Sequence, residues 1–289
     1  MAGKGKYYES QFEEATIELL REAHWQYTFG DDIHRKYTDP LIEEDLRNFL
    51  AAQYKDRDLT TSEIDGIVAN LRNTGGQNDY YALRNAFLLY RDGYDFAYSD
   101  GRDNPFRLEY IDFEHPDHNI FRCVNQFVME QGRENRRPDI LLFVNGIPVC
   151  IIELKNPTKQ NATIRDAHTQ ICTRYMRDIP ALLKYCALAV ISDGAKNALG
   201  TIYTPFEFFY EWKKIENEDK AGKGLDTLRT LIRGALSPER ILEILRDYVY
   251  FPDPTKEDDT TEIVCRYPQF FATRKLRDHI LNHLRSVGG

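Results

Sequence analysis

The sequence predicts an α/β fold in which a mixed, mostly antiparallel sheet has helices on both sides. Residues 1–100 place apolar side chains at helical spacing, as in the i, i+3, i+4, i+7 series that begins at Ile64. Between residues 106 and 192 this spacing gives way to short runs rich in Val, Ile and Phe. Gly, Pro or Asn bounds these runs, as is typical of strands. Helical spacing returns after residue 225, so a strand-rich centre lies between two helical portions.

The individual helices are predicted from their start signals and apolar faces. Thr60 and Glu63 form a capping box at the start of one helix, and Ser237 with Pro238 marks the start of another. Helices are expected at the N-terminus, after Thr60, at 79–91 and at 163–178, then twice between 225 and 250 and again at 268–285. Strands are expected at 106–113, 119–129, 139–144, 147–154 and 186–192, with a short one near 201–204.

Composition excludes several classes of protein. The 289 residues carry a net charge of −8, which argues against a generic polyanion binder. No apolar run approaches the roughly 20 residues of a membrane span, and Met1 to Tyr8 lack the apolar stretch of a signal peptide. The five cysteines include no CxxC pair, so zinc and disulfide frameworks are not predicted. A reducing cytoplasm is the expected location.

One short segment carries ionisable groups in an otherwise apolar hairpin. Asp139 precedes an apolar strand, Asn145-Gly146 is a strong turn signal, and Glu153 and Lys155 end the returning strand. Glu153 and Lys155 are two residues apart, so on a strand they share a face. Charges buried without partners are costly, so three ionisable groups at one end of a hairpin require an explanation.

Hydrolysis of a phosphodiester provides one reason. Two neighbouring carboxylates repel each other unless a divalent cation lies between them, and Mg²⁺ prefers oxygen ligands. A metal-bound water can become the nucleophile, while a lysine orients it and stabilises the anionic transition state. The alternative is a salt-bridged hairpin in which Lys155 only neutralises Asp139 and Glu153. The compound pattern of Pro-Asp, hairpin, Glu-x-Lys and basic helix favours the nuclease.

The segment resembles the PD-(D/E)xK nucleases, and more narrowly the N-terminal nuclease region of the R (restriction) subunit of type I restriction–modification enzymes. The residues that carry the resemblance are Pro138-Asp139, Glu153-Leu154-Lys155, Asn125-Gln126-Phe127, Ile179-Pro180, Ser192-Asp193-Gly194 and Gly200-Thr201. The resemblance covers most of residues 10–289. It implies a restriction-endonuclease-like sheet and Mg²⁺-dependent endonucleolytic cleavage of double-stranded DNA. It also implies metal ligation by Asp139, Glu153 and the Leu154 carbonyl, and catalysis by Lys155.

The resemblance also suggests supporting residues. Related nucleases carry Gln-x-x-x-Tyr on the following helix, whereas Gln170 and Tyr175 here have four residues between them. On an α-helix that spacing separates them by about 140°, so both are equally well explained as ordinary helix positions. Glu13 or Glu14 is a candidate first-helix acid for the metal site, although a solvated helix face explains both. His168 is expected at the surface rather than on a metal.

Basic residues gather around this segment despite the acidic total. Residues 155–184 hold six bases against two acids, a local net charge of +4. Lys159, Arg165, Arg174 and Arg177 are therefore expected to include phosphate contacts, because screening confines each interaction to about 10 Å. The alternative is a solvated basic helix face.

Three portions are expected. A helical portion, 1–100, packs on the nuclease core, 101–224, and residues 225–289 lead towards an ATP-dependent translocase that this sequence lacks. No GxxxxGK[ST] phosphate loop occurs, so ATP would bind only in the full-length protein. The resemblance implies specificity and methylation subunits as partners. Two alternatives stay open: a DNA-binding or subunit-docking module that is inactive in isolation, and a repair-type nuclease of the same superfamily.

The shared metal sets a geometric condition on the hairpin. A two-residue loop at 145–146 would oppose Asp139 to Ile152 and point it away from Glu153 and Lys155. We therefore expect either a three-residue loop, 144–146, with positive φ at Gly146, or a break in the strand pairing close to Asp139.

Overall fold

A mixed six-stranded sheet forms the centre of the protein, with the order β1-β4-β7-β8-β9-β10. The computed structural model describes residues 3–155, 163–216, 222–252 and 260–287. The β1–β4 and β8–β9 pairs are parallel and the other three are antiparallel, which confirms the predicted sheet. The strands are β1 (Gln26–Phe29), β4 (Phe121–Asn125), β7 (Ile140–Val144), β8 (Ile147–Leu154), β9 (Leu188–Ser192) and β10 (Asn197–Gly200).

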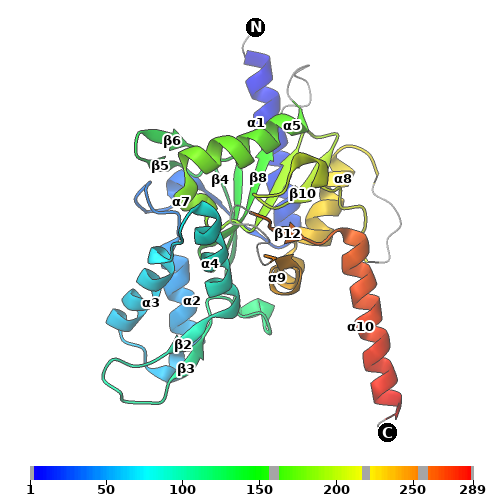
Figure 1. The fold of residues 1–289 in the computed structure, drawn as a ribbon. Helices are drawn as coiled ribbons and strands as arrows, with labels where there is room; N and C mark the ends of the chain where they lie inside the picture. The colour runs from blue at the N-terminus through cyan, green and yellow to red at the C-terminus, as the bar shows by residue number, and fades with distance from the viewer. Residues whose placement is uncertain (1–2, 156–162, 217–221, 253–259, 288–289) are drawn as a thin grey trace.

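Helices cover both faces of this sheet (Figure 1). Helix α5 lies across the front in this view, and α1 runs behind. A separate group of helices, α2 to α4, lies with the β2–β3 hairpin at the end of the sheet away from α5. The helices are α1 (Gly3–Glu22), α2 (Glu43–Gln53), α3 (Thr61–Asn73), α4 (Asp79–Asp92), α5 (Ile164–Thr169), α6 (Met176–Asp178), α7 (Pro180–Leu183), α8 (Leu225–Leu231), α9 (Pro238–Asp247) and α10 (Tyr267–Val287).

Shorter elements connect these layers. Two π-helical segments, η4 (Gln170–Tyr175) and η6 (Ile232–Leu236), continue α5 and α8. Three two-stranded ribbons pair β2 (Tyr94–Phe96) with β3 (Phe106–Leu108), β5 (Met129–Gln131) with β6 (Glu134–Arg136), and β11 (Val249–Tyr250) with β12 (Ile263–Val264). The 3-10 helices are η1 (Gly30–Asp32), η2 (Lys55–Arg57), η3 (Pro116–His118) and η5 (Phe206–Phe208).

Most of the expected elements are present, and one is misplaced. The capping box of Thr60 and Glu63 forms, and Ser237 and Pro238 stand at the start of α9. The strand expected near 201–204 is wrong, because Thr204 N–H donates to the Thr201 carbonyl in a turn there. The strand lies just before it, as β10. Among the described residues no helix combines the length and apolarity that crossing a membrane requires.

The β7–β8 hairpin satisfies the geometric condition in a way that differs from both expectations. Val144 pairs with Ile147, so the loop is the two-residue turn Asn145-Gly146, and the expected three-residue loop is wrong. Asn145 and Gly146 have φ of 50° and 76°, the positive values that this type of turn needs. The register then shifts at Val149, which bulges between Pro148 and Cys150. This break lies in the opposite strand and not close to Asp139.

The turn itself is buried and held by the Asn145 side chain. Its Oδ1 accepts from Ile120 N–H at 2.7 Å, and its Nδ2 donates to the Tyr110 carbonyl at 2.9 Å and to Asn119 Oδ1 at 2.8 Å. Asn145 is fully buried. The hairpin end of the sheet is therefore fixed to the loop 110–120.

Replacing Asn145 by alanine should lower the free energy of unfolding by about 2–4 kcal/mol, because it leaves buried donors and acceptors without partners. Alanine also tolerates the positive φ less well than asparagine does. Urea unfolding followed by circular dichroism measures the change. Asn135→Ala, on the exposed β5–β6 ribbon, is the matched control and should change stability little. Equal stability of the two variants would contradict the role given to Asn145.

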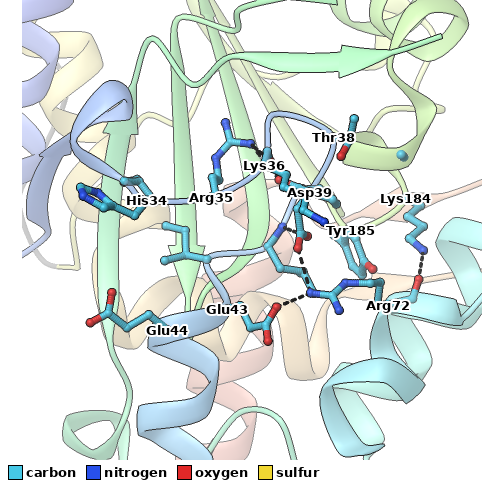
Figure 2. Close-up of a pocket in the computed structure, with 15 residues that line it drawn as sticks. His34, Arg35, Lys36, Thr38, Asp39, Glu43, Glu44, Arg72, Lys184 and Tyr185 are labelled. Atoms are coloured by element: carbon cyan, nitrogen blue, oxygen red, sulfur yellow. Dashed lines mark hydrogen bonds and ion pairs between the residues drawn. The ribbon is translucent and has the colours of Figure 1, made fainter. Parts of the chain in front are cut away.

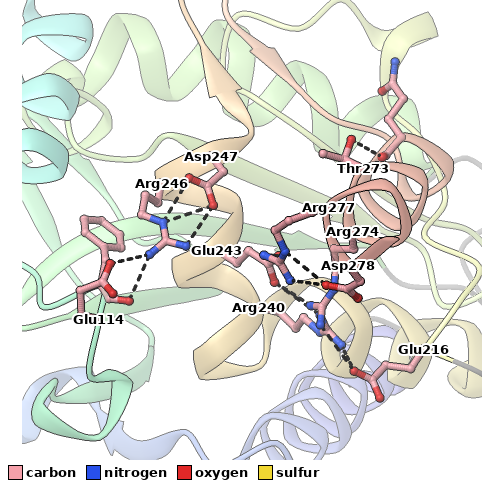
Figure 3. A network of polar contacts seen from close by, with 12 residues as sticks. Glu114, Glu216, Arg240, Glu243, Arg246, Asp247, Thr273, Arg274, Arg277 and Asp278 are labelled. Atoms are coloured by element: carbon pink, nitrogen blue, oxygen red, sulfur yellow. Dashed lines mark hydrogen bonds and ion pairs between the residues drawn. The ribbon is translucent and has the colours of Figure 1, made fainter. Parts of the chain in front are cut away.

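Helix α10 is joined to α9 by a charged network (Figure 3). Glu243 on α9 accepts from Arg274 Nη1 at 2.7 Å and lies within ion-pair distance of Arg240 and Arg277. Phe270 is fully buried against Trp212 in the same region. Together these contacts fix the first turns of α10 on the core, and the rest of the helix projects away from the body (Figure 1).

Candidate active site

The hairpin and its bulge bring the two predicted carboxylates together. Ile140 pairs with Ile152, so Asp139 lies across from Glu153 and the two share a face of the sheet. Asp139 Oδ2 accepts a hydrogen bond from Leu154 N–H at 2.7 Å, which fixes its carboxylate at the end of β8. Without the bulge, the two-residue turn would have placed these side chains on opposite faces.

Burial gives this pair unusual electrostatics. Glu153 is 1% exposed, and burial followed by repulsion from Asp139 raises its pKa well above the ordinary value. Burial also raises the pKa of Asp139 to about 6. Among the described residues, Glu153 Oε2 has no hydrogen-bond partner. Two carboxylates that ionise with difficulty, one with a free oxygen, fit the oxygen ligands that Mg²⁺ prefers.

Lys155 lies on the same face and is held from two sides. Its Nζ donates to Glu153 Oε1 at 2.8 Å and to Gln170 Oε1 at 2.7 Å, and its side chain is only 14% exposed. Two short hydrogen bonds to acceptors on different elements fix the position of the ammonium group. The structure therefore joins Asp139, Glu153 and Lys155 into one cluster at the carboxyl end of β8.

The structure brings Gln170 and Tyr175 to this cluster, which their spacing had argued against. Both lie in η4, whose wider π-helical turn places residues five apart on one side, whereas the 140° separation assumed an α-helix. Gln170 Nε2 donates to the Tyr175 hydroxyl at 2.7 Å. Burial and the nearby carboxylate of Glu153 raise the pKa of Tyr175. The extra residue between the two is absorbed as a π-bulge.

Glu13, the candidate first-helix acid, is held beside the same end of the sheet. Its carboxylate accepts from Asn125 Nδ2 at 2.6 Å and from Gln126 Nε2 at 2.9 and 3.0 Å. It lies near enough to Asp139 for its charge to contribute to the raised pKa of that carboxyl. Glu14, the other candidate, is exposed.

Asn125 and Gln126 were not identified as site residues from the sequence. Asn125 ends β4, the neighbour of β7, and Gln126 follows with a left-handed φ of 55° and its amide towards α1. The stretch Asn125-Gln126-Phe127 belongs to the resemblance, and this was the signal that could have identified them. Their contacts to Glu13 required the fold.

The basic residues that are expected to bind phosphate differ in whether another side chain already pairs with their charge. Arg165 and Arg174 are exposed, and Arg165 lies over the Phe206 ring. Arg177 is exposed too, but its Nε donates to Asp178 at 2.6 Å, so its charge is already matched. Lys159 lies outside the described residues.

His168 does not belong to the cluster. It is half-buried rather than at the surface, and its Nε2 lies 2.9 Å from the Thr204 carbonyl. Its ring packs edge-on against Phe206 and Phe209. It therefore joins the η4 region to the segment after β10, and it takes no part in the carboxylate site.

A hollow of about 510 Å³ lies away from this cluster, beside the loop 33–44 and the helices α3 and α7 (Figure 2). Arg72 in its wall pairs with Asp39 and Glu43. Lys184 donates to backbone carbonyls at the end of α3. These two cations are engaged within the fold, and the hollow shares no residue with the carboxylate cluster.

Comparison with known proteins identifies the family of this chain. Residues 6–208 match the family described as type I restriction enzyme R protein N terminus. The chain belongs to this family. The carboxylate pair, the lysine and the Gln–Tyr contact all lie within the matched part of the R protein N terminus.

Curated relatives of this R protein N terminus extend the match along almost the whole chain. It is 28% identical over 282 residues to the type I restriction enzyme HindI endonuclease subunit of Haemophilus influenzae, and this covers 93% of the chain and 26% of the relative. The putative MjaIXP endonuclease subunit of Methanocaldococcus jannaschii is 27% identical, covering 93% and 27%. The EcoprrI endonuclease subunit of Escherichia coli is 28% identical, covering 63% and 56%. The chain thus spans about a quarter of the length of the first two.

Proposed function

We propose that this R protein N terminus is a Mg²⁺-dependent endonuclease that cleaves double-stranded DNA. The observation that carries the proposal is the pair of facing carboxylates, Asp139 and the buried Glu153, beside Lys155; in the described part of the chain one Glu153 oxygen has no hydrogen-bond partner. An unmatched buried carboxylate oxygen is costly, and a divalent cation between Asp139 and Glu153 would match it while it offsets their repulsion. The names of the relatives, endonuclease subunits of type I restriction enzymes, support the same class of reaction.

Asp139 and Glu153 would hold the metal, and the resemblance adds the Leu154 carbonyl. When bound, Mg²⁺ provides a Lewis acid and lowers the pKa of a coordinated water. Leu154 N–H keeps one oxygen of Asp139 in place, which leaves its other oxygen to face the site. Glu13 lies behind this pair and is a further carboxylate for the outer coordination of the site.

Lys155 would act on the scissile phosphate. Its ammonium group is positioned by Glu153 and Gln170, so little reorganisation is needed before it donates to an anionic oxygen. Gln170 is in turn fixed by the Tyr175 hydroxyl. We infer that Gln170 and Tyr175 are positioning residues, since they contact the site through Lys155 and the carboxylates.

The test is cleavage of supercoiled plasmid by the purified chain. Nicking with Mg²⁺ or Mn²⁺, and none in EDTA or with Asp139→Asn, is the expected result. Thermal unfolding with and without Mg²⁺ provides a second readout, because a ligand that binds only the folded state raises the melting temperature. Cleavage that continues unchanged in EDTA would refute the metal-dependent mechanism.

A DNA-binding or docking module is the second candidate, and the exposed Arg165 and Arg174 would serve it without the carboxylates. DNA binding without cleavage in the same assay would support it. In a complete enzyme we propose that specificity and methylation subunits choose the target and that ATP acts elsewhere in the protein. The expected cytoplasmic location is part of the same proposal.

Exposed arginines beside the site should contact DNA phosphates. Arg165→Ala combined with Arg174→Ala should weaken binding and reduce the slope of log affinity against log salt by about 1 for each arginine that neutralises a phosphate. Arg177→Ala is the matched control, and its effect should be smaller because Asp178 already pairs with it. Fluorescence anisotropy on a short duplex at several salt concentrations measures both. An unchanged slope in the double variant would place the DNA elsewhere.

A further inference from the structure

An aspartate and two histidines converge at the end of the sheet opposite the carboxylate cluster. Asp112, His115 and His118 occupy the loop between β3 and β4. Asp112 Oδ2 lies 3.3 Å from His115 Nδ1 and 2.9 Å from His118 Nδ1. One ligand atom from each residue falls within 4.8 Å of the others. The two rings stack with centroids 4.8 Å apart, and both turn Nδ1 towards Asp112 Oδ2.

The fold holds this loop in place. Asp112 is buried, and its other oxygen, Oδ1, accepts from the backbone N–H groups of Glu114 and His115 at 3.0 and 2.9 Å. Asn119 accepts from Asp112 N–H and donates back to the Asp112 carbonyl. The buried Asn145 of the hairpin turn anchors Asn119 in turn. The carboxylate is therefore oriented before any ligand arrives.

More donors face Asp112 Oδ2 than one carboxylate oxygen can serve well. Gln53 Nε2 at the end of α2 lies 3.1 Å away, in addition to the two imidazoles. A carboxylate oxygen has about two lone-pair positions, so Gln53 Nε2 and two protonated Nδ1 atoms would be one donor too many for it. If the imidazoles carry their protons on Nε2 instead, both Nδ1 atoms become acceptors. The three converging atoms are then all electron-pair donors that face a common point.

We propose that Asp112, His115 and His118 form a binding site for a divalent transition-metal ion of the Zn²⁺ type. Two imidazole nitrogens and one carboxylate oxygen suit Zn²⁺, Co²⁺ or Ni²⁺, whereas Mg²⁺ prefers oxygen alone. At bond lengths of about 2.0–2.1 Å, the ligand atoms of a tetrahedral zinc lie about 3.4 Å apart. The observed separations of 3.3 and 2.9 Å need only a small widening.

The surroundings favour a cation and leave room for it. Glu109 lies close enough to Asp112 for their charges to interact. Glu114 and Asp117 add negative charge in the same loop, and the nearby cation Arg246 pairs with Glu114. The side chains of His115 and His118 are 63% and 50% exposed, so an ion can enter from solvent. Three protein ligands leave the fourth position of a tetrahedral ion to water.

The site is independent of the proposed nuclease chemistry. It lies beside the turn of the β7–β8 hairpin, whereas Asp139 lies at the other end of β7. Metal there would hold together the 112–118 loop, which Asn119 connects to the hairpin turn. The expected effect is on the stability of this end of the fold, with little effect on cleavage.

Calorimetric titration of chelator-treated protein with Zn²⁺ tests the proposal, with millimolar Mg²⁺ present to occupy the carboxylate cluster. A second histidine pair, His279 and His283 on α10, has the i, i+4 spacing that places two imidazoles on one helix face, so replacing this pair provides the matched control. His115→Ala with His118→Ala should remove one bound equivalent and the zinc-dependent rise in melting temperature. His279→Ala with His283→Ala should retain both.

Circular dichroism without metal shows whether each variant folds, and the exposure of both loop histidines predicts that it does. Co²⁺ absorption gives a further readout, because tetrahedral nitrogen and oxygen ligation produces visible bands that the loop variant should lack. Zinc binding of unchanged stoichiometry and affinity in the loop variant would overturn the proposal. Loss of the equivalent in the α10 variant alone would also overturn it.

Discussion

Replacing Lys155 by alanine should lower the rate of plasmid cleavage by about 100-fold or more, the effect of removing one preorganised donor from a transition state. Lys155 is held by Glu153 and Gln170, so its ammonium group is fixed beside the proposed metal ligands, where it would donate to an anionic phosphate oxygen. Alanine leaves both carboxylates in place but leaves nothing to stabilise the developing charge. DNA affinity should change much less, because one phosphate contact is a small part of the electrostatic attraction.

The matched control is Lys55→Ala in the exposed η2 segment, far along the chain from the cluster. It removes the same charge from the protein and should leave the cleavage rate unchanged. Single-turnover kinetics at saturating enzyme separates the chemical step from binding. A Lys155→Ala variant that cleaves at the wild-type rate would exclude Lys155 from catalysis and favour the structural salt bridge.

The core of the candidate site was predictable because it is local. Asp139, Glu153 and Lys155 lie within one hairpin, and a shared metal already required the two carboxylates to lie on one face of it. The sequence did not reveal how this happens. The bulge at Val149 follows Pro148, which lacks a backbone N–H. Neither residue type predicts a register shift by itself.

The Gln170–Tyr175 contact shows a different limit. Its spacing was judged against α-helical geometry, and a π-bulge changes that geometry by one residue without a characteristic sequence.

The contacts of Glu13 could not be predicted from the sequence for another reason. They join α1 to the end of β4, more than 100 positions away, and depend on the left-handed conformation of Gln126. Long-range contacts of this kind are set by packing rather than by any local pattern.

Asp139→Asn should stabilise the metal-free protein at neutral pH by up to about 3 kcal/mol, while it abolishes cleavage. Burial raises the pKa of Asp139 from 3.8 to about 6 in the folded state. The folded state therefore binds more protons than the unfolded state between about pH 4 and pH 6. Stability is fully present below this window and is lost as the pH rises through it. Asparagine still accepts from Leu154 N–H but carries no charge, so the Asp139→Asn variant does not lose this part of the free energy of unfolding.

Urea unfolding in EDTA at pH 4.5 and pH 7.5 measures the difference. The wild type should lose stability between the two values, and the variant should lose less, since the pair with Glu153 titrates together and one charge has been removed. Mg²⁺ should restore stability to the wild type alone, because the variant lacks one ligand of the proposed site. Asp56→Asn, an exposed carboxylate in η2, is the control and should follow the wild type. A variant less stable than wild type at pH 7.5 in EDTA would mean that Asp139 supports the fold rather than a metal.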